Sequence, residues 1–203
     1  RHACDYVVNA AGPWLAQVGE LLGAPVHLIN QRHEACVFEL PEALAGRLPA
    51  TLTNVPMVEG EDEESLYFRP EGETQMIAGL HSYSLGVPEH SDPDDYQRGV
   101  GEATVETLAE QLLRVFPGVD DIRYRGGWAG LYPTPADLLP IAGPHPADER
   151  VLVAGGGGGA GISVAAPIGR TIADYLVHGE PRALAFADRL ALRPAVLEPP
   201  VAR

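Results

Sequence analysis

The sequence has few cysteines, few basic residues and no long apolar run, and each shortage excludes a class of protein. Cys4 and Cys36 are its two cysteines in 203 residues, too few for a disulfide framework. Lys and Arg total 14 against 28 Asp and Glu, so with a formal net charge of −14 neither a nucleic acid nor an anionic membrane surface is an expected partner. No apolar run reaches the roughly 18 residues that a membrane-spanning helix needs. We therefore expect a soluble, cytoplasmic protein.

The composition favours a globular protein of mixed α/β type. Hydrophobic residues make up 45% of the chain and charged residues 21%, which is enough apolar material for a buried core. The 23 glycines and 19 prolines predict many turns and few long helices. The chain opens RHACDYVVNAAG, without an initiator Met or a secretory leader, so we expect it to be cut from a longer polypeptide.

Two segments that each read as a strand, a glycine turn and a helix flank a region with a different sequence pattern. Residues 5–12 form a β-prone run that ends on Gly12, and an apolar pattern over residues 14–22 predicts a helix after it. Residues 151–154 predict a second short strand, followed by a glycine loop at 155–161 and a helix over 162–177. Between these segments, residues 26–122 read as strands separated by turns, which indicates a largely antiparallel sheet.

The region between the two segments also contains one amphipathic helix, and the chain ends in a proline-rich tail. Apolar residues recur every three or four positions over residues 105–116, before Pro117-Gly118 stops the pattern. This helix is expected to pack on the sheet. The tail, residues 181–203, is predicted to be mostly irregular.

The loop Gly155-Gly-Gly-Gly-Gly-Ala-Gly161 is suited to close contact with a ligand. Its backbone N–H groups can approach an anion or the edge of an electron-rich ring, and the dipole of the following helix adds partial positive charge. It is not a Walker loop, because no Lys-Ser or Lys-Thr follows it. The alternative is a flexible linker, which its place between two regular elements disfavours.

Three motifs follow one another along the chain: VVNAAGPW, then WAGLYPTPADLLPIAG, then LVAGGGGGAGI. This order resembles that of the D-amino-acid oxidase superfamily of FAD enzymes. The likeness covers roughly residues 5–180 and is greatest to the branch that holds sarcosine oxidase, dimethylglycine dehydrogenase and glycine oxidase. It implies FAD as cofactor and an α/β (α+β) fold, in which a partial Rossmann-like FAD-binding domain carries an inserted, mainly antiparallel substrate-binding sheet. The expected divisions are FAD-binding segments at 1–24 and 124–180, a substrate sheet at 25–123 and an irregular tail at 181–203.

The resemblance also assigns roles to residues. Tyr67 and His81 fall where the sarcosine oxidase branch keeps a Tyr and a His on the substrate side of the flavin, so both are catalytic candidates facing the glycine loop. On residue type alone, a packing Tyr and a surface or core His remain the alternatives. The positions that match the family's flavin-binding motifs are Ala11, Gly12, Trp14, Gly157, Gly158, Gly159, Ala160, Gly161 and Ile162.

The sequence departs from the family pattern at several positions. Gly130 stands where monomeric sarcosine oxidases carry the flavin-linking Cys, which excludes covalent attachment at that position, and Thr134-Pro-Ala-Asp137 is one residue longer than the family's Thr-Pro-Asp. Tyr132 replaces an Arg of glycine oxidase-like members, while Gly159 and Ser163 stand where some members carry a Lys or Arg. These losses put a simple α-amino acid substrate in doubt. Arg69 is a candidate replacement, and it and Tyr132 are the expected substrate-binding residues.

No metal site is expected. The acidic segments at 59–64 and 89–95 lack the spacing of a calcium loop or a zinc site, and His33, Cys36, His81 and His90 lack compact ligand spacing. Solvated turns are the preferred interpretation of both acidic segments.

The resemblance implies that the intact protein oxidises a secondary or tertiary amine, or an amino acid, by hydride transfer to the flavin. The family's first strand, its dinucleotide-binding turn and its acidic ribose-binding residue are expected in an amino-terminal half outside these 203 residues, so the isolated chain should be inactive. Two alternatives stay open: a 2-hydroxy-acid or glycerol-3-phosphate type dehydrogenase of the same superfamily, and a non-enzymatic nucleotide-binding scaffold. The electron acceptor, whether oxygen, a quinone or an electron-transfer protein, is left open.

Overall fold

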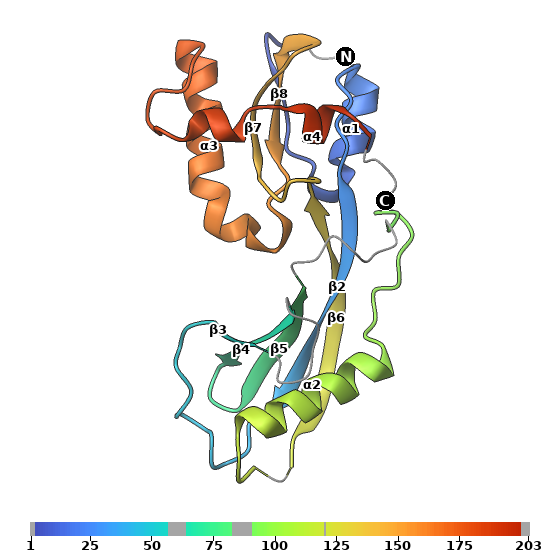
Figure 1. Cartoon of the computed structure of the whole chain (residues 1–203), viewed down its shortest axis with the longest axis vertical. Helices are drawn as coiled ribbons and strands as arrows, with labels where there is room; N and C mark the ends of the chain where they lie inside the picture. Colours follow the sequence, from blue (N-terminus) through green and yellow to red (C-terminus); the bar gives the residue numbers. More distant parts are fainter. Residues whose placement is uncertain (1–2, 57–63, 83–90, 120, 200–203) are drawn as a thin grey trace. The chain divides into compact units, whose positions relative to one another are not determined.

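The computed structural model describes residues 3–56, 64–82, 91–119 and 121–199, and divides the chain into two units (Figure 1). The first comprises Arg1–Gln31, Glu89–Asp94 and Leu131–Arg203; the second comprises Arg32–Pro88 and Asp95–Gly130. Helices and sheets occur in both, so the mixed α/β class is confirmed. The division departs from the expected limits of 25–123, because residues 25–31 belong to the first unit and residues 124–130 to the second.

The first unit contains a three-stranded sheet with helices joined to its strands. Strand β8 (Asp148–Gly155) is central, with β1 (Val7–Asn9) parallel to it on one side and β7 (Ile141–His145) antiparallel on the other. Each parallel strand runs through a short 3-10 turn into a helix, as the glycine patterns predicted. These elements are η1 (Gly12–Trp14), α1 (Leu15–Leu22), η2 (Gly158–Ala160) and α3 (Gly161–His178).

The core of the first unit forms two apolar clusters of buried side chains. The cluster that includes α1 contains Leu15, Val26, Leu28, Ile141, Val153 and Val196, and the cluster that includes α3 contains Ala142, Leu152, Ile172 and Leu190. Burial of apolar side chains is the main stabilising contribution to such a small layer. Both clusters include residues from the tail.

The tail was expected to be mostly irregular, and it carries two short helical elements among irregular residues. The tail forms η3 (Ala187–Leu190) and α4 (Pro194–Leu197), and Val196 is fully buried. The His27 N–H donates to the Val196 carbonyl at 2.8 Å. Pro194 at the start of α4 is favourable, because the first helical residue needs no N–H partner. The tail is therefore part of the first unit's core.

The second unit is built on an antiparallel sheet, as expected. Its strand order is β3-β4-β5-β2-β6, and the β3–β4, β4–β5 and β5–β2 pairs are antiparallel. Strands β2 and β6 each continue along the chain from one unit into the other. The strands are β2 (Ile29–Glu39), β3 (Thr53–Pro56), β4 (Glu64–Glu71), β5 (Gln75–Ser82) and β6 (Arg123–Thr134).

One face of this sheet is covered by α2 (Glu102–Val115). Alternate strand residues and the apolar stripe of α2 form a buried cluster of Cys36, Phe38, Leu40, Leu66, Phe68, Met76, Ala78, Leu108 and Leu112. Because side chains alternate along a strand, the residues between these project from the other face. Tyr67, Gly79 and His81 are on that second face.

A partly buried carboxylate fixes the start of α2. Glu34 accepts a hydrogen bond from the Gly101 N–H at 2.9 Å and another from the Thr104 hydroxyl, and it also pairs with Arg32. These bonds outweigh the effect of burial and hold the pKa of Glu34 below its usual value. The helix therefore begins three residues before the expected position at 105, because Glu34 supplies an acceptor that lies far away in the sequence.

Candidate cofactor and substrate sites

The two glycine motifs of the first unit leave the sheet at the same edge. Strands β1 and β8 are parallel, with Val7 opposite Val151 and Asn9 opposite Val153. Parallel neighbours end on the same side of a sheet, so the turn after Asn9 and the loop after Gly155 both start from its carboxyl edge. Ligands of open α/β sheets bind outside this edge.

The first motif is held in shape by Asn9, a buried side chain. Its amide nitrogen donates to the Leu15 carbonyl at 2.9 Å, and its amide oxygen accepts from the Ala11 N–H at 3.4 Å. Gly12 adopts φ +59°, which a residue with a side chain adopts only with strain. The turn therefore keeps a fixed backbone path with Ala11 and Gly12 partly accessible at the surface.

Trp14 is held in place by a hydrogen bond to a segment that is distant in sequence. Its indole N–H donates to the Asp94 carboxylate at 2.8 Å. Asp94 lies in Glu89–Asp94, a short segment that belongs to the first unit although the residues before and after it belong to the second. The neighbouring Pro13 carbonyl accepts from the Asn30 amide at 2.9 Å. The indole is 37% exposed, so its orientation is fixed by one hydrogen bond rather than by full burial.

The second motif is a loop whose backbone closely approaches its neighbours. A Cβ added to Gly155 would lie 2.3 Å from the Leu15 side chain, and one added to Gly157 would lie 2.8 Å from the Gly161 Cα. At Gly156, with φ +65°, an added Cβ would lie 2.8 Å from the Pro135 ring. Side chains are therefore excluded at these three positions, which explains the glycines at 155–157.

The loop ends in the exposed start of α3. Its cap residue, Ala160, makes no side-chain hydrogen bond, and the first turn carries no acidic residue. The first N–H groups of a helix lack partners within the helix and carry partial positive charge. Ile162, in the first turn, is 96% exposed. The start of α3 thus offers N–H donors beside an apolar side chain, a combination that fits the polar edge and flat ring of a flavin.

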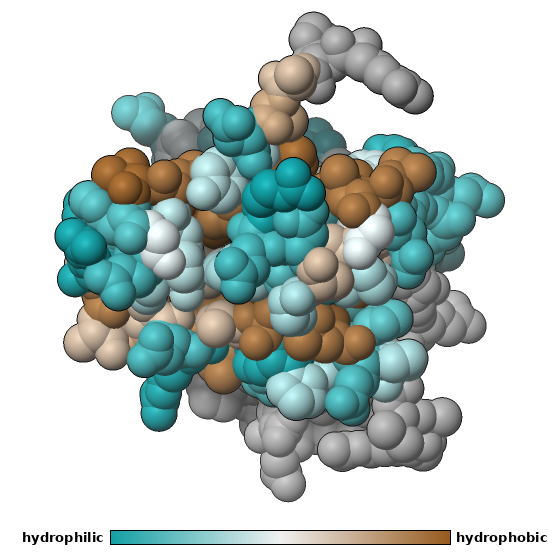
Figure 2. Space-filling model, turned by 90° about the horizontal axis from the view of Figure 1, so that it is seen from above, coloured by the Kyte–Doolittle hydropathy of each residue, from teal (hydrophilic) through white to brown (hydrophobic). Residues whose placement is uncertain are grey.

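Large apolar side chains are also exposed elsewhere on the chain. Viewed from above, the surface shows separate hydrophobic patches between polar residues (Figure 2). Besides Ile162, the most exposed are Leu21 at 86% and Val177 at 72%. Scattered exposure of this kind is normal, so the apolar character of Ile162 is informative only because it accompanies the loop.

In the second unit, the structure brings the two catalytic candidates together. Tyr67 on β4 and His81 on β5 meet edge to face, with ring centroids 6.4 Å apart. Gly79, opposite Tyr67 in the β4–β5 register, makes room for the phenol, since an added Cβ would lie 2.3 Å from the Tyr67 oxygen. Burial lowers the pKa of His81, so its ring is neutral at neutral pH.

His33 joins this pair, and sequence reasoning missed it. It lies on β2 two residues before Ala35, which pairs with Gly79, so His33 shares the face and the row of His81. Burial and the neighbouring His81 lower the pKa of His33 to about 4, while the Leu80 carbonyl opposes the shift. Two histidines separated by 48 positions (81 − 33) show no ligand spacing in the sequence, and only the strand register brings them together.

Two other expected residues take different positions. Arg69 is exposed on β4, where it pairs with Glu71 and donates to the Pro70 carbonyl at 3.2 Å. Tyr132 lies on β6 in the first unit, and its carbonyl accepts from the Thr134 hydroxyl at 3.1 Å. Arg69 and Tyr132 thus belong to different units, and their joint role in substrate binding stays a prediction.

The acidic segments can be compared with the structure only in part. Residues 59–63 and 89–90, His90 among them, lie outside the described residues. The remaining described positions contain no group of three or more His, Cys, Asp or Glu side chains that could hold a metal ion. Among the same residues, no helix is long and apolar enough to span a bilayer.

A family model described as FAD dependent oxidoreductase (DAO) matches residues 1–175. The chain belongs to this family. The match covers both glycine motifs and the inserted sheet, so the suspected family, the fold class and FAD as cofactor are confirmed.

Individual relatives agree with the family. Rat mitochondrial dimethylglycine dehydrogenase is 30% identical over 183 residues, which is 86% of this chain and 21% of the relative. Glycine oxidase from Geobacillus kaustophilus is 24% identical over 178 residues, 88% of this chain and 42% of the relative.

Solved structures show the same fold. The crystal structure of that glycine oxidase superposes with a TM-score of 0.69 over 94% of this chain and 46% of its own, at 24% identity. The crystal structure of L-proline dehydrogenase from P. horikoshii also superposes with a TM-score of 0.69, over 93% of this chain and 48% of its own, at 19% identity. The chain therefore spans less than half the length of each of these relatives.

Proposed function

We propose that this chain is the flavin-facing part of an enzyme that oxidises the C–N bond of a secondary or tertiary amine, or of an amino acid. The observation that carries the proposal is the shared carboxyl edge of β1 and β8, from which both glycine motifs of the family leave. The relatives named dimethylglycine dehydrogenase and glycine oxidase support an amine or amino-acid substrate.

The residues at this edge have a defined role in the proposal. When bound, FAD accepts a hydride from the carbon next to the substrate nitrogen. The N–H groups of Gly161 and Ile162, in the first turn of α3, stabilise negative charge at the ring edge, and that turn carries no acidic residue. Ala11, Gly12 and Trp14 form the second contact surface, fixed by Asn9 and Asp94.

The histidines of the second unit supply the acid–base part of the proposal. An amine must lose its extra proton before its C–H bond can be oxidised, and a neutral imidazole is a suitable acceptor. Burial keeps His81 neutral at neutral pH. His33 is neutral as well and so does not repel an ammonium substrate. Tyr67 orients the acceptor through its edge-to-face contact with His81.

The test uses the gene product with any coding sequence upstream of Arg1. Purified protein is mixed without oxygen with sarcosine, dimethylglycine, proline or glycine, and in parallel with 2-hydroxyglutarate or glycerol 3-phosphate. We expect one of the amines to bleach the visible flavin absorbance. Bleaching by a hydroxy compound alone would contradict the proposed substrate class, and a flavoprotein that no donor reduces would favour a non-enzymatic scaffold.

A second experiment tests the acid–base role of His81. His81→Asn is expected to lower the rate of flavin reduction at neutral pH and to move the acid-side fall in that rate to higher pH, because the amine must then lose its proton to solvent. His178→Asn, at the exposed end of α3, is the matched control and should leave both unchanged. An unchanged rate across the pH range in His81→Asn would exclude His81 as the proton acceptor.

A further inference from the structure

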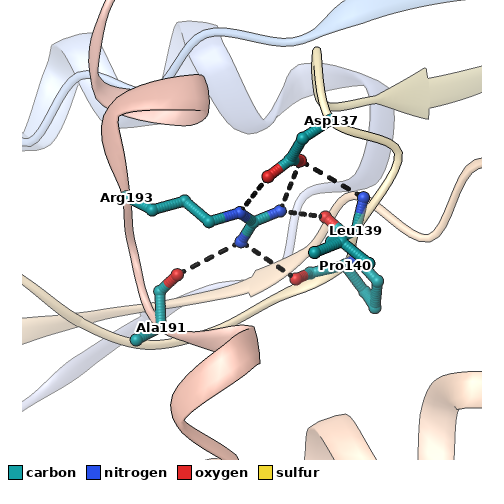
Figure 3. A network of polar contacts seen from close by, with 5 residues as sticks. All are labelled: Asp137, Leu139, Pro140, Ala191 and Arg193. Carbon is teal, nitrogen blue, oxygen red and sulfur yellow. Dashed lines mark hydrogen bonds and ion pairs between the residues drawn. The ribbon is translucent and has the colours of Figure 1, made fainter.

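Arg193, in the tail, makes an unusually complete set of hydrogen bonds (Figure 3). Its Nε and Nη2 bind the two Asp137 carboxylate oxygens, the Nη2–Oδ1 distance being 2.7 Å. Nη2 also donates to the Leu139 carbonyl, and Nη1 donates to the carbonyls of Pro140 at 3.3 Å and Ala191 at 3.1 Å. These five bonds use all five N–H groups that a guanidinium offers.

Four of the five bonds converge on one loop, residues 137–140, between β6 and β7. Leu138 in this loop has φ +63°, the single positive value at a described residue other than glycine. Its N–H donates to the Pro135 carbonyl at 3.0 Å, and the Leu139 N–H donates to the Asp137 carboxylate at 3.2 Å. A strained conformation of this kind persists only where the surroundings hold it, and here the Arg193 guanidinium and the Asp137 carboxylate do so.

The two residues Thr134 and Pro135, which precede this loop, pack against the glycine loop. The Pro135 ring lies so close to Gly156 that an added Cβ would come within 2.8 Å of it. The Thr134 hydroxyl faces Gly158, where an added Cβ would lie 3.5 Å away. Thr134 and Pro135 are both buried. A series of contacts therefore leads from Arg193 through the loop at 137–140 to Pro135, and from Pro135 and Thr134 to the backbone of Gly156 and Gly158.

We propose that Arg193 is a positioning residue for the glycine loop: by clamping residues 137–140 it presses Pro135 and Thr134 against Gly156 and Gly158 and fixes the direction of the loop N–H groups. The inference rests on the proposed function only in taking FAD as the ligand of those groups. The clamp itself is a property of the first unit and can be measured without the cofactor.

The direct test is hydrogen exchange in the 203-residue chain. Arg193→Lys keeps the positive charge but loses the planar fork, so it cannot make the two parallel bonds to Asp137 together with the carbonyl bonds. We expect the amides of residues 138–139 and 156–158 to exchange about tenfold faster, the change produced by weakening a charge-assisted hydrogen bond. Amides in the middle of β8, such as Leu152, should exchange at the wild-type rate.

Arg150→Lys is the matched control. Arg150 also forms a forked pair with an aspartate, Asp148, in the same unit, but 74% of its side chain is exposed and the pair lies at the start of β8. This variant should leave exchange in the glycine loop unchanged. Uniformly faster exchange throughout the first unit in Arg193→Lys would show a general stability effect and overturn the inference, as would unchanged exchange at residues 156–158.

The functional consequence is measured as FAD affinity of the longer gene product, by titration of the apoprotein with FAD. Arg193→Lys and Asp137→Asn should each raise the dissociation constant for FAD about tenfold, and the double variant should do no more than either single change. Faster loop exchange with unchanged FAD affinity would overturn the positioning role. Wild-type protein that binds no FAD would refute the proposed function, and the exchange result would then decide for or against the clamp alone.

Discussion

At the residue scale, the histidine pair of the second unit shows how strand register creates a site. His33 and His81 share a row of the sheet, and Tyr67 meets His81 from the adjacent strand. A proton on one ring disfavours a proton on the other, so the pair carries at most one positive charge until the pH approaches 4. Residues with perturbed pKa values gather at functional sites, which supports a role for His33 beside the two expected candidates.

We predict that His81→Asn raises the pKa of His33 from about 4 toward its ordinary value of 6.5. The change removes the like charge next to His33 and leaves the effect of burial, so the rise should be partial. The His33 imidazole signals, followed by NMR across a pH titration, measure it directly. His178→Asn serves as the control, and an unshifted His33 titration in His81→Asn would mean that the rings are not coupled.

Single residues also mark where sequence reasoning reaches its limit. Tyr67 and His81 could be selected because the family resemblance assigned them, whereas His33 depends on a strand register that the sequence does not display. Arg69 was a reasonable carboxylate-binding candidate, but Glu71 stands two positions away on the same face of β4 and pairs with its guanidinium. Local competition of this kind is visible only once the strand is placed.

At the scale of elements, α3 links the glycine loop to the tail. Near its end, the Asp174 side chain is 4% exposed and accepts hydrogen bonds from the N–H groups of Arg182 and Ala183, both at 2.8 Å. Arg170, one turn earlier, adds a third bond at 2.9 Å. These bonds, chiefly the two from the backbone, hold the pKa of Asp174 below its usual value. Asp174 thus turns the chain from α3 into the tail.

We predict that Asp174→Asn lowers the urea midpoint of unfolding at neutral pH, because an amide accepts the two N–H bonds more weakly and turns donors toward them. The folded-state pKa lies below the unfolded value of 3.8, so the stabilisation by the carboxylate is complete above that pH. It is lost as the pH falls through the folded-state pKa. The difference in urea midpoint between Asp174→Asn and wild type should therefore become smaller at acid pH.

The control for this prediction is Asp121→Asn, since Asp121 and Arg123 form an ion pair in which each side chain is 64% exposed. An exposed pair contributes little to stability, so this variant should match the wild type. If the difference in urea midpoint between Asp174→Asn and wild type stayed constant down to acid pH, the stabilisation could not come from the ionised Asp174 carboxylate.

The periodic elements could be predicted and their exact ends could not. The pattern over residues 162–177 matches α3 at 161–178, and the strand expected at 151–154 is the buried centre of β8 at 148–155. The start of α2 depends on Glu34, and the placement of α4 involves a hydrogen bond from His27, in the segment between α1 and β2. Such long-range contacts leave no periodic signal, and the tail's prolines resembled those of an irregular segment.

At the scale of the whole molecule, the tail completes the first unit. Val196 is fully buried in the cluster that contains Leu15 and Val153, and Arg193 clamps the loop at residues 137–140. The sequence and the family likeness predicted the order of the two glycine segments and the inserted sheet, but the likeness ended near residue 180. Residues beyond it are nonetheless part of the same core.

We predict that Val196→Ala lowers the free energy of unfolding by about 2 kcal/mol, from the lost burial of two methyl groups and the cavity left behind. Urea unfolding followed by circular dichroism measures the change. Val177→Ala is the matched control, because Val177 is 72% exposed and the same substitution there should stay within about 0.5 kcal/mol. Equal effects at the two positions would contradict burial of the tail in the core.

The central claim is that the flavin binds where β1 and β8 end, and the flavin content of the purified longer gene product tests it most directly. Gly158→Val and Gly179→Val each place a branched side chain at a positive φ, +49° and +75°, but only the first lies in the glycine loop. The account predicts FAD bound at wild-type occupancy in Gly179→Val and lost in Gly158→Val. Equal occupancy in the two folded variants would contradict it.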